Sequence, residues 1–127
     1  MAAAYGLTDN WEYTAVNIEI HQRDHAAVVC IVGSVDGLTA PVLLAEFHAC
    51  VAAGNTCLVA DLGSVDYTSS AGLRALLATM KETRLQGGDL RLSNVTPHVL
   101  KVLELSGFTS IMKLYDDVDT AVASYAG

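Results

Sequence analysis

The sequence predicts one α/β domain with a mostly parallel sheet of about five strands, one antiparallel edge strand and about four helices. Three observations lead to this fold class. A length of 127 residues suits a single domain. Apolar patterns typical of strands and of helices alternate along the chain. Hydrophobic residues make up 52% but aromatic residues only 6%, so we expect a core of aliphatic side chains in regular layers.

The first two strands are expected near the start of the chain. Apolar and polar residues alternate over 16–22, which is the pattern of a half-buried strand. Residues 26–32 are continuously apolar, which indicates a strand buried on both faces, and 23–25 suit a hairpin turn between the two. Residues 1–14 show no sustained period, so we expect a loose arm or a short edge strand there and one domain over 15–127.

After the second strand, helices and strands alternate, and each helix is bounded by a capping residue, a proline or a glycine. The expected helix boundaries are Thr39, Gly54, Gly87, Thr96, Gly107 and one of Asp116, Asp117 and Asp119. The expected strands between the helices are 56–62, interpreted as buried on both faces, a segment around Leu90 and Leu92, and 111–115. The order is therefore β-β-α-β-α-β-α-β-α, which implies right-handed crossovers between parallel strands.

The charge and hydropathy of the chain disfavour two classes of partner. The formal net charge of −7 repels phosphate backbones and anionic lipid headgroups. The longest uncharged run, 47–60, is broken by Gly54 and Asn55 and is shorter than the roughly 20 residues of a membrane span. The N-terminus lacks the basic and apolar regions of a signal peptide. We therefore expect a cytoplasmic protein without direct nucleic-acid contact or membrane insertion.

Neither the cysteines nor the histidines follow a metal-binding pattern. Cys30, Cys50 and Cys57 show no CxxC spacing and lie in apolar stretches, so we interpret them as reduced, buried thiols. The histidines are scattered without ligand spacing. The sequence also contains no phosphate-binding loop of the GxxxxGKS/T or GxGxxG type. It therefore predicts no metal site and no cofactor.

The most informative segment runs from Val65 to Leu77, where an expected strand leads through hydroxyl residues into an amphipathic helix. This order places Ser69 and Ser70 at a helix N-terminus. The backbone N–H groups of a first helical turn are unpaired and partially positive, so a hydroxyl there either caps the helix or holds a phosphate. Asp36 follows the neighbouring strand, and the carboxyl ends of parallel strands share one edge of a sheet, so we expect Asp36 and Ser70 on one surface.

A serine at a strand-to-helix turn also invites comparison with the nucleophile elbow of hydrolases, G-x-S-x-G. Here the segment 68–72 reads Thr-Ser-Ser-Ala-Gly, so the first glycine of that motif is missing. The only histidine after the serines is His98, which is expected at the start of a helix opened by Pro97. Because a triad requires a histidine within hydrogen-bonding reach of the serine, a hydrolase is disfavoured and we assign no catalytic residue.

Four segments resemble, in order, the motifs of the anti-sigma factor antagonists, which are stand-alone STAS domains of bacteria. The resemblance extends from about Val16 to Tyr125 and includes the alternation of strands and helices. The four segments are Gly33-Ser34-Val35-Asp36, Val59-Ala60-Asp61-Leu62, Asp66 to Leu73 and Val102 to Phe108. The resemblance implies the STAS fold and a regulatory protein that is not itself an enzyme.

The resemblance further implies a switch controlled by phosphorylation. In such proteins the serine two positions before the signature glycine, here Ser70, is phosphorylated by a partner that is both anti-sigma factor and serine protein kinase of the histidine-kinase-like ATPase type. The unphosphorylated form binds that partner and frees the sigma factor, and a phosphatase reverses the modification. The implied partner-binding residues are Ser34, Asp36, Thr68, Ser69, Ser70, Ala71, Gly72 and Arg74.

Two positions differ from the pattern of the family and leave alternatives open. Ser69 stands where the residue before the phosphoacceptor is commonly Asp, and Ser34 stands where the first turn has Glu. Ser69 is therefore a competing acceptor. The lost charges also agree with a second interpretation, a STAS scaffold that is never phosphorylated and belongs to a transport or lipid-trafficking assembly. An exposed edge strand and the N-terminal arm would suit a homodimer.

Overall fold

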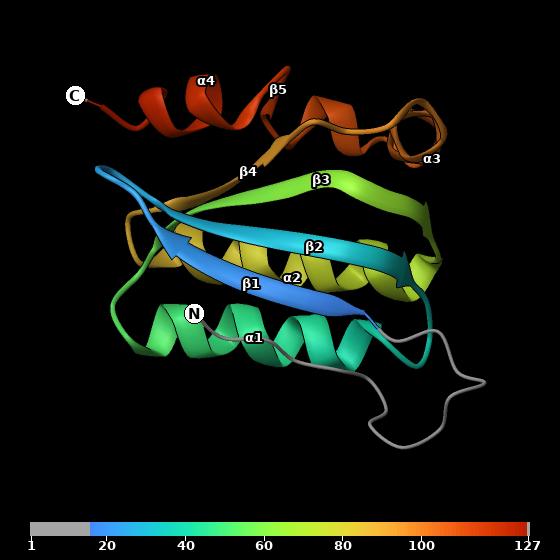
Figure 1. Cartoon of the computed structure of the whole chain (residues 1–127), viewed down its shortest axis with the longest axis horizontal. Helices are drawn as coiled ribbons and strands as arrows, with labels where there is room; N and C mark the ends of the chain where they lie inside the picture. Colours follow the sequence, from blue (N-terminus) through green and yellow to red (C-terminus); the bar gives the residue numbers. More distant parts are fainter. Residues whose placement is uncertain (1–15, 127) are drawn as a thin grey trace.

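The computed structural model describes residues 16–126, so the expectation for residues 1–14 lies outside the described part of the chain. One sheet contains five strands in the order β1-β2-β3-β4-β5 (Figure 1). β1 pairs antiparallel with β2, and the other three pairings are parallel. The prediction of a mostly parallel sheet with one antiparallel edge strand is confirmed. The strands are β1 (Asn17–Gln22), β2 (Ala27–Val35), β3 (Cys57–Thr68), β4 (Asp89–Ser93) and β5 (Leu114–Tyr115).

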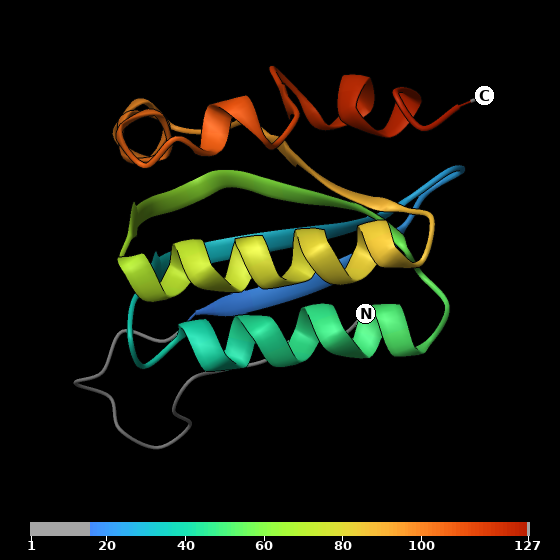
Figure 2. The ribbon, with the colours of Figure 1, turned by 180° about the vertical axis from the view of Figure 1, so that it is seen from behind.

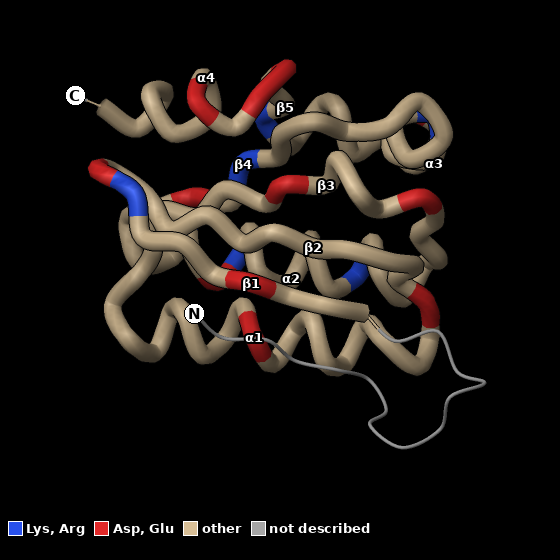
Figure 3. Tube along the Cα trace, in the orientation of Figure 1, with Lys and Arg blue, Asp and Glu red and all other residues tan. Residues whose placement is uncertain are grey.

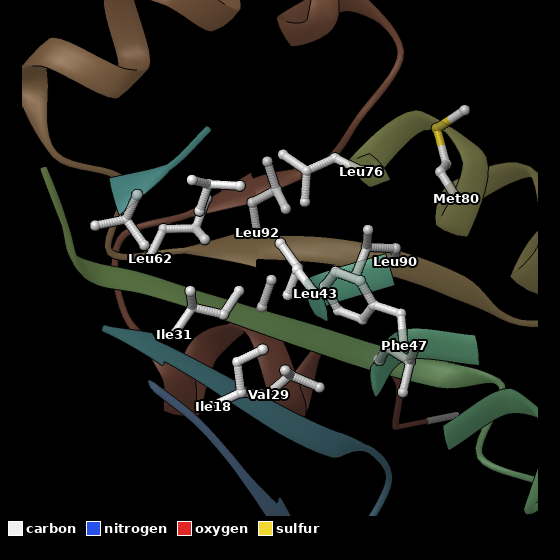
Figure 4. Close-up of a cluster of buried hydrophobic side chains, with 14 of the residues drawn as sticks. Ile18, Val29, Ile31, Leu43, Phe47, Leu62, Leu76, Met80, Leu90 and Leu92 are labelled. Carbon is white, nitrogen blue, oxygen red and sulfur yellow. The ribbon is translucent and has the colours of Figure 1, made fainter. Parts of the chain in front are cut away.

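Helices cover the two faces of the sheet unequally. They are α1 (Ala40–Ala52), α2 (Ser70–Leu85), α3 (Pro97–Leu105) and α4 (Val118–Ala123), with a short 3-10 helix, η1 (Phe108–Ser110). α1, α2 and α3 contribute to the main core on one face, where α1 and α2 lie side by side (Figure 2). In that core, Leu43 and Phe47 of α1 and Leu76 of α2 meet Ile31 and Leu90 of the sheet (Figure 4). The predicted aliphatic core is therefore confirmed.

The opposite face of the sheet is covered mainly by the short α4. Ala121 and Val122 of α4 pack there against Val28 of β2 and Val59 of β3. Farther along β2 this cover ends, and Val32 is 50% exposed. The expectation that 26–32 is buried on both faces is therefore wrong at Val32, because α4 is only 6 residues long and does not extend over it.

The two central strands are longer than predicted, and the last strand is shorter. β2 continues to Val35 and β3 to Thr68. Two register shifts in their pairing let the strands stay paired past residues that break the apolar pattern. The segment 111–115 contributes only its last two residues to β5, because residues 111–113 form the turn that leads from η1 to this strand. The longer β2 and β3 bring two loops together at one edge of the sheet.

Candidate functional site

The loops that follow β2 and β3 are joined through the backbone. Val35 and Thr68 are register partners at the ends of these parallel strands. One residue later, the backbone N–H of Ser69 donates a hydrogen bond to the carbonyl oxygen of Val35 at 2.8 Å. The turn containing Asp36 and the turn containing Ser70 therefore lie at the same edge of the sheet, which is where the topology was expected to place them.

Ser69 and Ser70 occupy different environments. Ser69 is the N-cap of α2 with an extended backbone, and its side chain accepts a hydrogen bond from the N–H of Gly72 at 3.5 Å. Ser70 is the first residue of α2 and is exposed. Within residues 16–126 the Ser70 hydroxyl makes no hydrogen bond to another residue. Ser69 thus serves the helix, whereas the oxygen of Ser70 is open to a reacting partner.

Gly72 allows the helix to approach the strand ends closely. A Cβ atom at Gly72 would collide with Oγ1 of Thr68 and would lie 2.8 Å from Cγ1 of Val35. Thr68 is itself buried, and its hydroxyl donates to the carbonyl oxygen of Ser69 at 3.3 Å. Gly72 and Thr68 therefore shape the turn from within, while Ala71 is half-buried and Arg74 is exposed.

The carboxylate of Asp36 is turned toward its own loop. It accepts hydrogen bonds from the N–H groups of Leu38 and Thr39 at 2.9 and 3.0 Å. Burial alone would raise the pKa of Asp36, but these N–H donors together with the Thr39 hydroxyl lower it below its ordinary value. Asp36 is ionised near neutral pH and holds the loop in place.

The expectation that Thr39 caps α1 through its side chain is wrong. Thr39 occupies the N-cap position, yet its side chain makes no capping hydrogen bond. Its hydroxyl instead accepts from the N–H of Asp36 at 2.8 Å and lies 2.8 Å from the carbonyl oxygen of Ser34. Because Thr39 is fully buried, its hydroxyl satisfies backbone groups of the loop.

Ser34 forms a second link between the two strand ends. Its hydroxyl donates to a carboxylate oxygen of Asp66 at 3.0 Å, in an exposed position. Figure 3 shows acidic stretches beside the ends of β2 and β3, where these residues lie. The serine that stands in place of the family's glutamate is thus held by an acid of the neighbouring strand.

Apolar side chains beside the serines extend this surface, and sequence reasoning missed them. Leu38 lies two residues after Asp36 and is 67% exposed. Tyr67 comes just before residues 68–70, which we call the serine turn, and is 45% exposed. The Tyr67 ring stacks on the ring of His98 with centroids 6.4 Å apart. The exposure of Leu38 could have been predicted, because it directly follows the turn dipeptide Asp36-Gly37. The contact of Tyr67 could not, because His98 is far away in the sequence.

A shallow groove of about 510 Å³ runs between α1 and α2 next to the serine turn. Small side chains of α2 form one wall, which keeps the groove open. Leu44 of α1 reaches it from the other side, and Arg74 is its charged residue. The residues lining it are Gly37, Ala40, Pro41, Leu44, Ala71, Arg74, Ala75 and Ala78.

Two other kinds of site find no support in the geometry. His98 stacks on Tyr67, and within residues 16–126 it makes no hydrogen bond to Ser70, so the geometry does not support a Ser70–His98 pair of the hydrolase type. Within residues 16–126 there is also no group of three or more His, Cys, Asp or Glu residues that could hold a metal ion. No helix in the same part of the chain is both long and apolar enough to cross a bilayer.

Comparison with known proteins places this fold and this turn in one family. The STAS domain profile matches residues 17–121. The chain belongs to the STAS domain family. The family predicted from the sequence motifs is thereby confirmed, and the predicted mixed sheet with its four helices is the fold of this STAS domain.

Curated relatives of this STAS domain include anti-sigma factor antagonists. It is 40% identical over 110 residues to BtrV of Bordetella bronchiseptica, whose name assigns it provisionally to that class, covering 87% of this chain and 95% of BtrV. It is 27% identical over 99 residues to the anti-sigma-B factor antagonist of Bacillus subtilis, covering 78% of this chain and 90% of that protein.

A solved structure shares both the fold and part of the sequence. The crystal structure of an anti-sigma factor antagonist from Mycobacterium paratuberculosis superimposes on this STAS domain with a TM-score of 0.81. The two are 28% identical, and the superposition covers 88% of this chain and 95% of the other. The similarity therefore covers most of both chains.

Proposed function

We propose that this STAS domain is an anti-sigma factor antagonist that acts by partner switching, with Ser70 as its phosphoacceptor. In this proposal it is a cytoplasmic regulator without catalytic activity of its own. Its partners are an anti-sigma factor that is also a serine kinase of the histidine-kinase-like ATPase type, and a phosphatase. The observation that carries the proposal is the division of roles between the adjacent serines: Ser69 caps α2, and Ser70 is exposed beside it.

The modification is a phosphoryl transfer onto the oxygen of Ser70. The partner kinase supplies ATP, and Oγ of Ser70 forms a bond to the γ-phosphorus as the bond to ADP breaks and the hydroxyl proton leaves. A phosphatase removes the modification by hydrolysis, in which water supplies the oxygen that leaves with inorganic phosphate and the Ser70 hydroxyl is restored. Since Ser69 keeps its capping role throughout, the helix start stays in place while the group beside it changes.

The position of Ser70 explains how one phosphate can act as a switch without unfolding the domain. A phosphate adds about −1.5 to −2 charges at neutral pH, and a helix N-terminus tolerates that charge. A partner surface fitted to the bare hydroxyl does not, because the dianion must be desolvated and finds no matching charge in an interface formed around a neutral group. A loss of a few kcal/mol corresponds to at least about hundredfold weaker binding.

The surface offered to the partner combines apolar and polar groups around Ser70. Leu38 and Tyr67 are exposed large hydrophobic residues on either side of the serine turn. The link between Ser34 and Asp66 is exposed at the same edge. We infer that the apolar pair provides contact area, and that the polar groups and Ser70 determine which state of the protein is bound.

The test combines modification and binding. The native protein is used to recover its kinase from cell extract, then incubated with that kinase and ATP and analysed by intact mass and site mapping. We expect one phosphate on the parent and on Ser69→Ala, and none on Ser70→Ala. Isothermal titration should show at least about hundredfold weaker binding of the kinase to the phosphorylated protein.

Two results would contradict the proposal. Unchanged phosphorylation of Ser70→Ala would assign the acceptor elsewhere, with loss in Ser69→Ala pointing to the neighbouring serine. Recovery of transporter or lipid-trafficking subunits in place of a kinase, together with no phosphate on the native protein, would support the scaffold interpretation.

A further inference from the structure

Arg74 lies one helical turn beyond Ser70 on α2. Residues four apart on a helix share a face, with Cβ atoms about 5–6 Å apart. Both side chains are exposed, so neither is fixed by packing. A long arginine side chain can therefore reach a group attached to the Ser70 oxygen without any change in the backbone.

Within residues 16–126, Arg74 differs from the other arginines because it has no acidic partner. Arg23 pairs with Asp119, and both Arg84 and Arg91 pair with Asp89, at distances of 2.8 to 3.1 Å. The small side chains that line the groove beside Arg74 leave space for its guanidinium group.

The acids at the same edge are already engaged. The carboxylate of Asp36 is held by the N–H groups of its own loop, and the carboxylate of Asp66 accepts from the Ser34 hydroxyl. Neither carboxylate forms an ion pair with Arg74, so within residues 16–126 its guanidinium group is available to a phosphate on Ser70.

We propose that Arg74 is the internal cation that binds the phosphate once Ser70 is phosphorylated. This inference rests on the proposed function, because it concerns the same serine. The forked N–H donors of a guanidinium match two phosphate oxygens, and the i to i+4 spacing on one helix places them within reach. The phosphate is then held against the start of α2.

The pairing gives phosphorylation a second effect on the docking surface. In the unmodified protein, Arg74 is the charged residue of the groove between α1 and α2. When it binds the phosphate, its guanidinium turns toward Ser70 and no longer offers a positive charge to a partner in the groove. Modification therefore adds negative charge at the turn and withdraws positive charge from the groove beside it.

The test measures the phosphate itself. Phosphoserine is inserted at position 70 during translation, so that no kinase is needed, and the second pKa of the phosphate is followed by 31P NMR. A nearby cation favours the dianion, so Arg74→Ala should raise this pKa by about 0.15 to 0.4 pH unit. Arg74→Lys should retain most of the parent's value, and about 1 M salt should reduce the difference between parent and Arg74→Ala.

Lys81→Ala is the matched control, since Lys81 is an exposed cation farther along α2. It should leave the phosphate pKa unchanged. Equal pKa values in the parent and Arg74→Ala would overturn the inference, as would equal shifts in Arg74→Ala and Lys81→Ala. A kinase that fails to modify Ser70 counts against the proposed function and does not affect this measurement.

Discussion

The polar side chains at the two ends of helix α2 differ in how firmly they are held by hydrogen bonds. At the N-terminal end, Ser69 supplies one long capping hydrogen bond of 3.5 Å, and Ser70 is exposed. At the C-terminal end, Arg84 donates to Asp89 at 2.8 Å and to the carbonyl oxygen of Ile111 at 2.7 Å. Helix α2 is thus held in place at its C-terminal end, and its N-terminal end, which carries Ser70, is accessible.

The fixed end extends into a network that holds several elements together. Asp89, whose side chain is 9% exposed, also accepts from Arg91 at 3.1 Å. Arg91 in turn donates to Oγ of Ser124 at 2.7 Å and lies over the Tyr125 ring, 3.9 Å from its centroid. The Tyr125 hydroxyl lies 2.7 Å from the carbonyl oxygen of Leu58, and burial raises the pKa of Tyr125. The network therefore anchors the chain end after α4 to the sheet.

Removing the acid at the centre of this network should have the largest effect on stability. Asp89→Ala leaves Arg91, whose side chain is 13% exposed, without its anion. Breaking such a pair by deleting one partner costs about 3 kcal/mol. Urea unfolding followed by circular dichroism should show this loss. Asp119→Ala, which removes the exposed partner of Arg23, should cost no more than about 0.5 kcal/mol; equal losses would refute the contrast.

A methyl group at the serine turn should have the next largest effect. Gly72→Ala places a Cβ against Thr68 and Val35, and overpacking of this kind costs about 2 kcal/mol. The turn shifts, so recognition by the kinase should weaken as well. Gly37→Ala is the control, because no heavy atom lies within 4 Å of a Cβ at that position. If both variants unfold at the same urea concentration, the close contacts at Gly72 do not affect the free energy of unfolding, and the prediction is wrong.

Acid should weaken the fixed end of α2, where Asp89 lies. Burial raises the pKa of Asp89, but hydrogen bonds from Arg84 and Arg91 outweigh it and the net pKa is lowered. A lowered folded-state pKa means that the stabilisation is fully present above the unfolded value of about 4 and is lost as pH falls through the folded value. Unfolding free energies measured between neutral pH and strong acid should therefore decline below about pH 4.

Asp89→Asn separates this effect from that of other acids. Asp36 also has a lowered pKa, owing to N–H donors of its loop, and contributes to the decline in the parent. The variant should start less stable and show a shallower decline. Parallel curves for the two proteins would mean that Asp89 does not account for the acid sensitivity.

The contrast between the two ends of α2 also explains which features the sequence could predict. The serine turn was predictable because strand, hydroxyl residues and helix follow one another, and because parallel topology places the Asp36 loop beside them. The Asp89 network was not, since Arg91 and Ser124 are far apart in the chain. Thr39 supplies no side-chain cap for a related reason: the Asp36 and Thr39 side chains hydrogen-bond within the loop before α1, and only the folded loop determines those partners.

The exposed hydrophobic residues were missed on similar grounds. Apolar periodicity predicts which residues face a core, but it cannot show that cover ends partway along a face. Tyr67 lies on the second half of β3, where exposed and buried residues are mixed, and its stack on His98 depends on where α3 begins. Sequence reasoning therefore predicted the position of the serine turn but not the exposed hydrophobic residues around it.

The smallest change should separate the two adjacent serines most clearly. Ser69→Ala removes the capping hydrogen bond to Gly72, and because that bond is long, the loss should be near the low end for such caps, about 0.5 kcal/mol. Ser70→Ala removes an exposed hydroxyl without a partner in the described residues, so its unfolding free energy should stay within about 0.3 kcal/mol of the parent. Phosphorylation should follow the opposite order, retained in Ser69→Ala and lost in Ser70→Ala. If one variant lost both stability and phosphorylation, a single serine would be both the cap and the acceptor. The proposed division of roles between Ser69 and Ser70 would then be wrong.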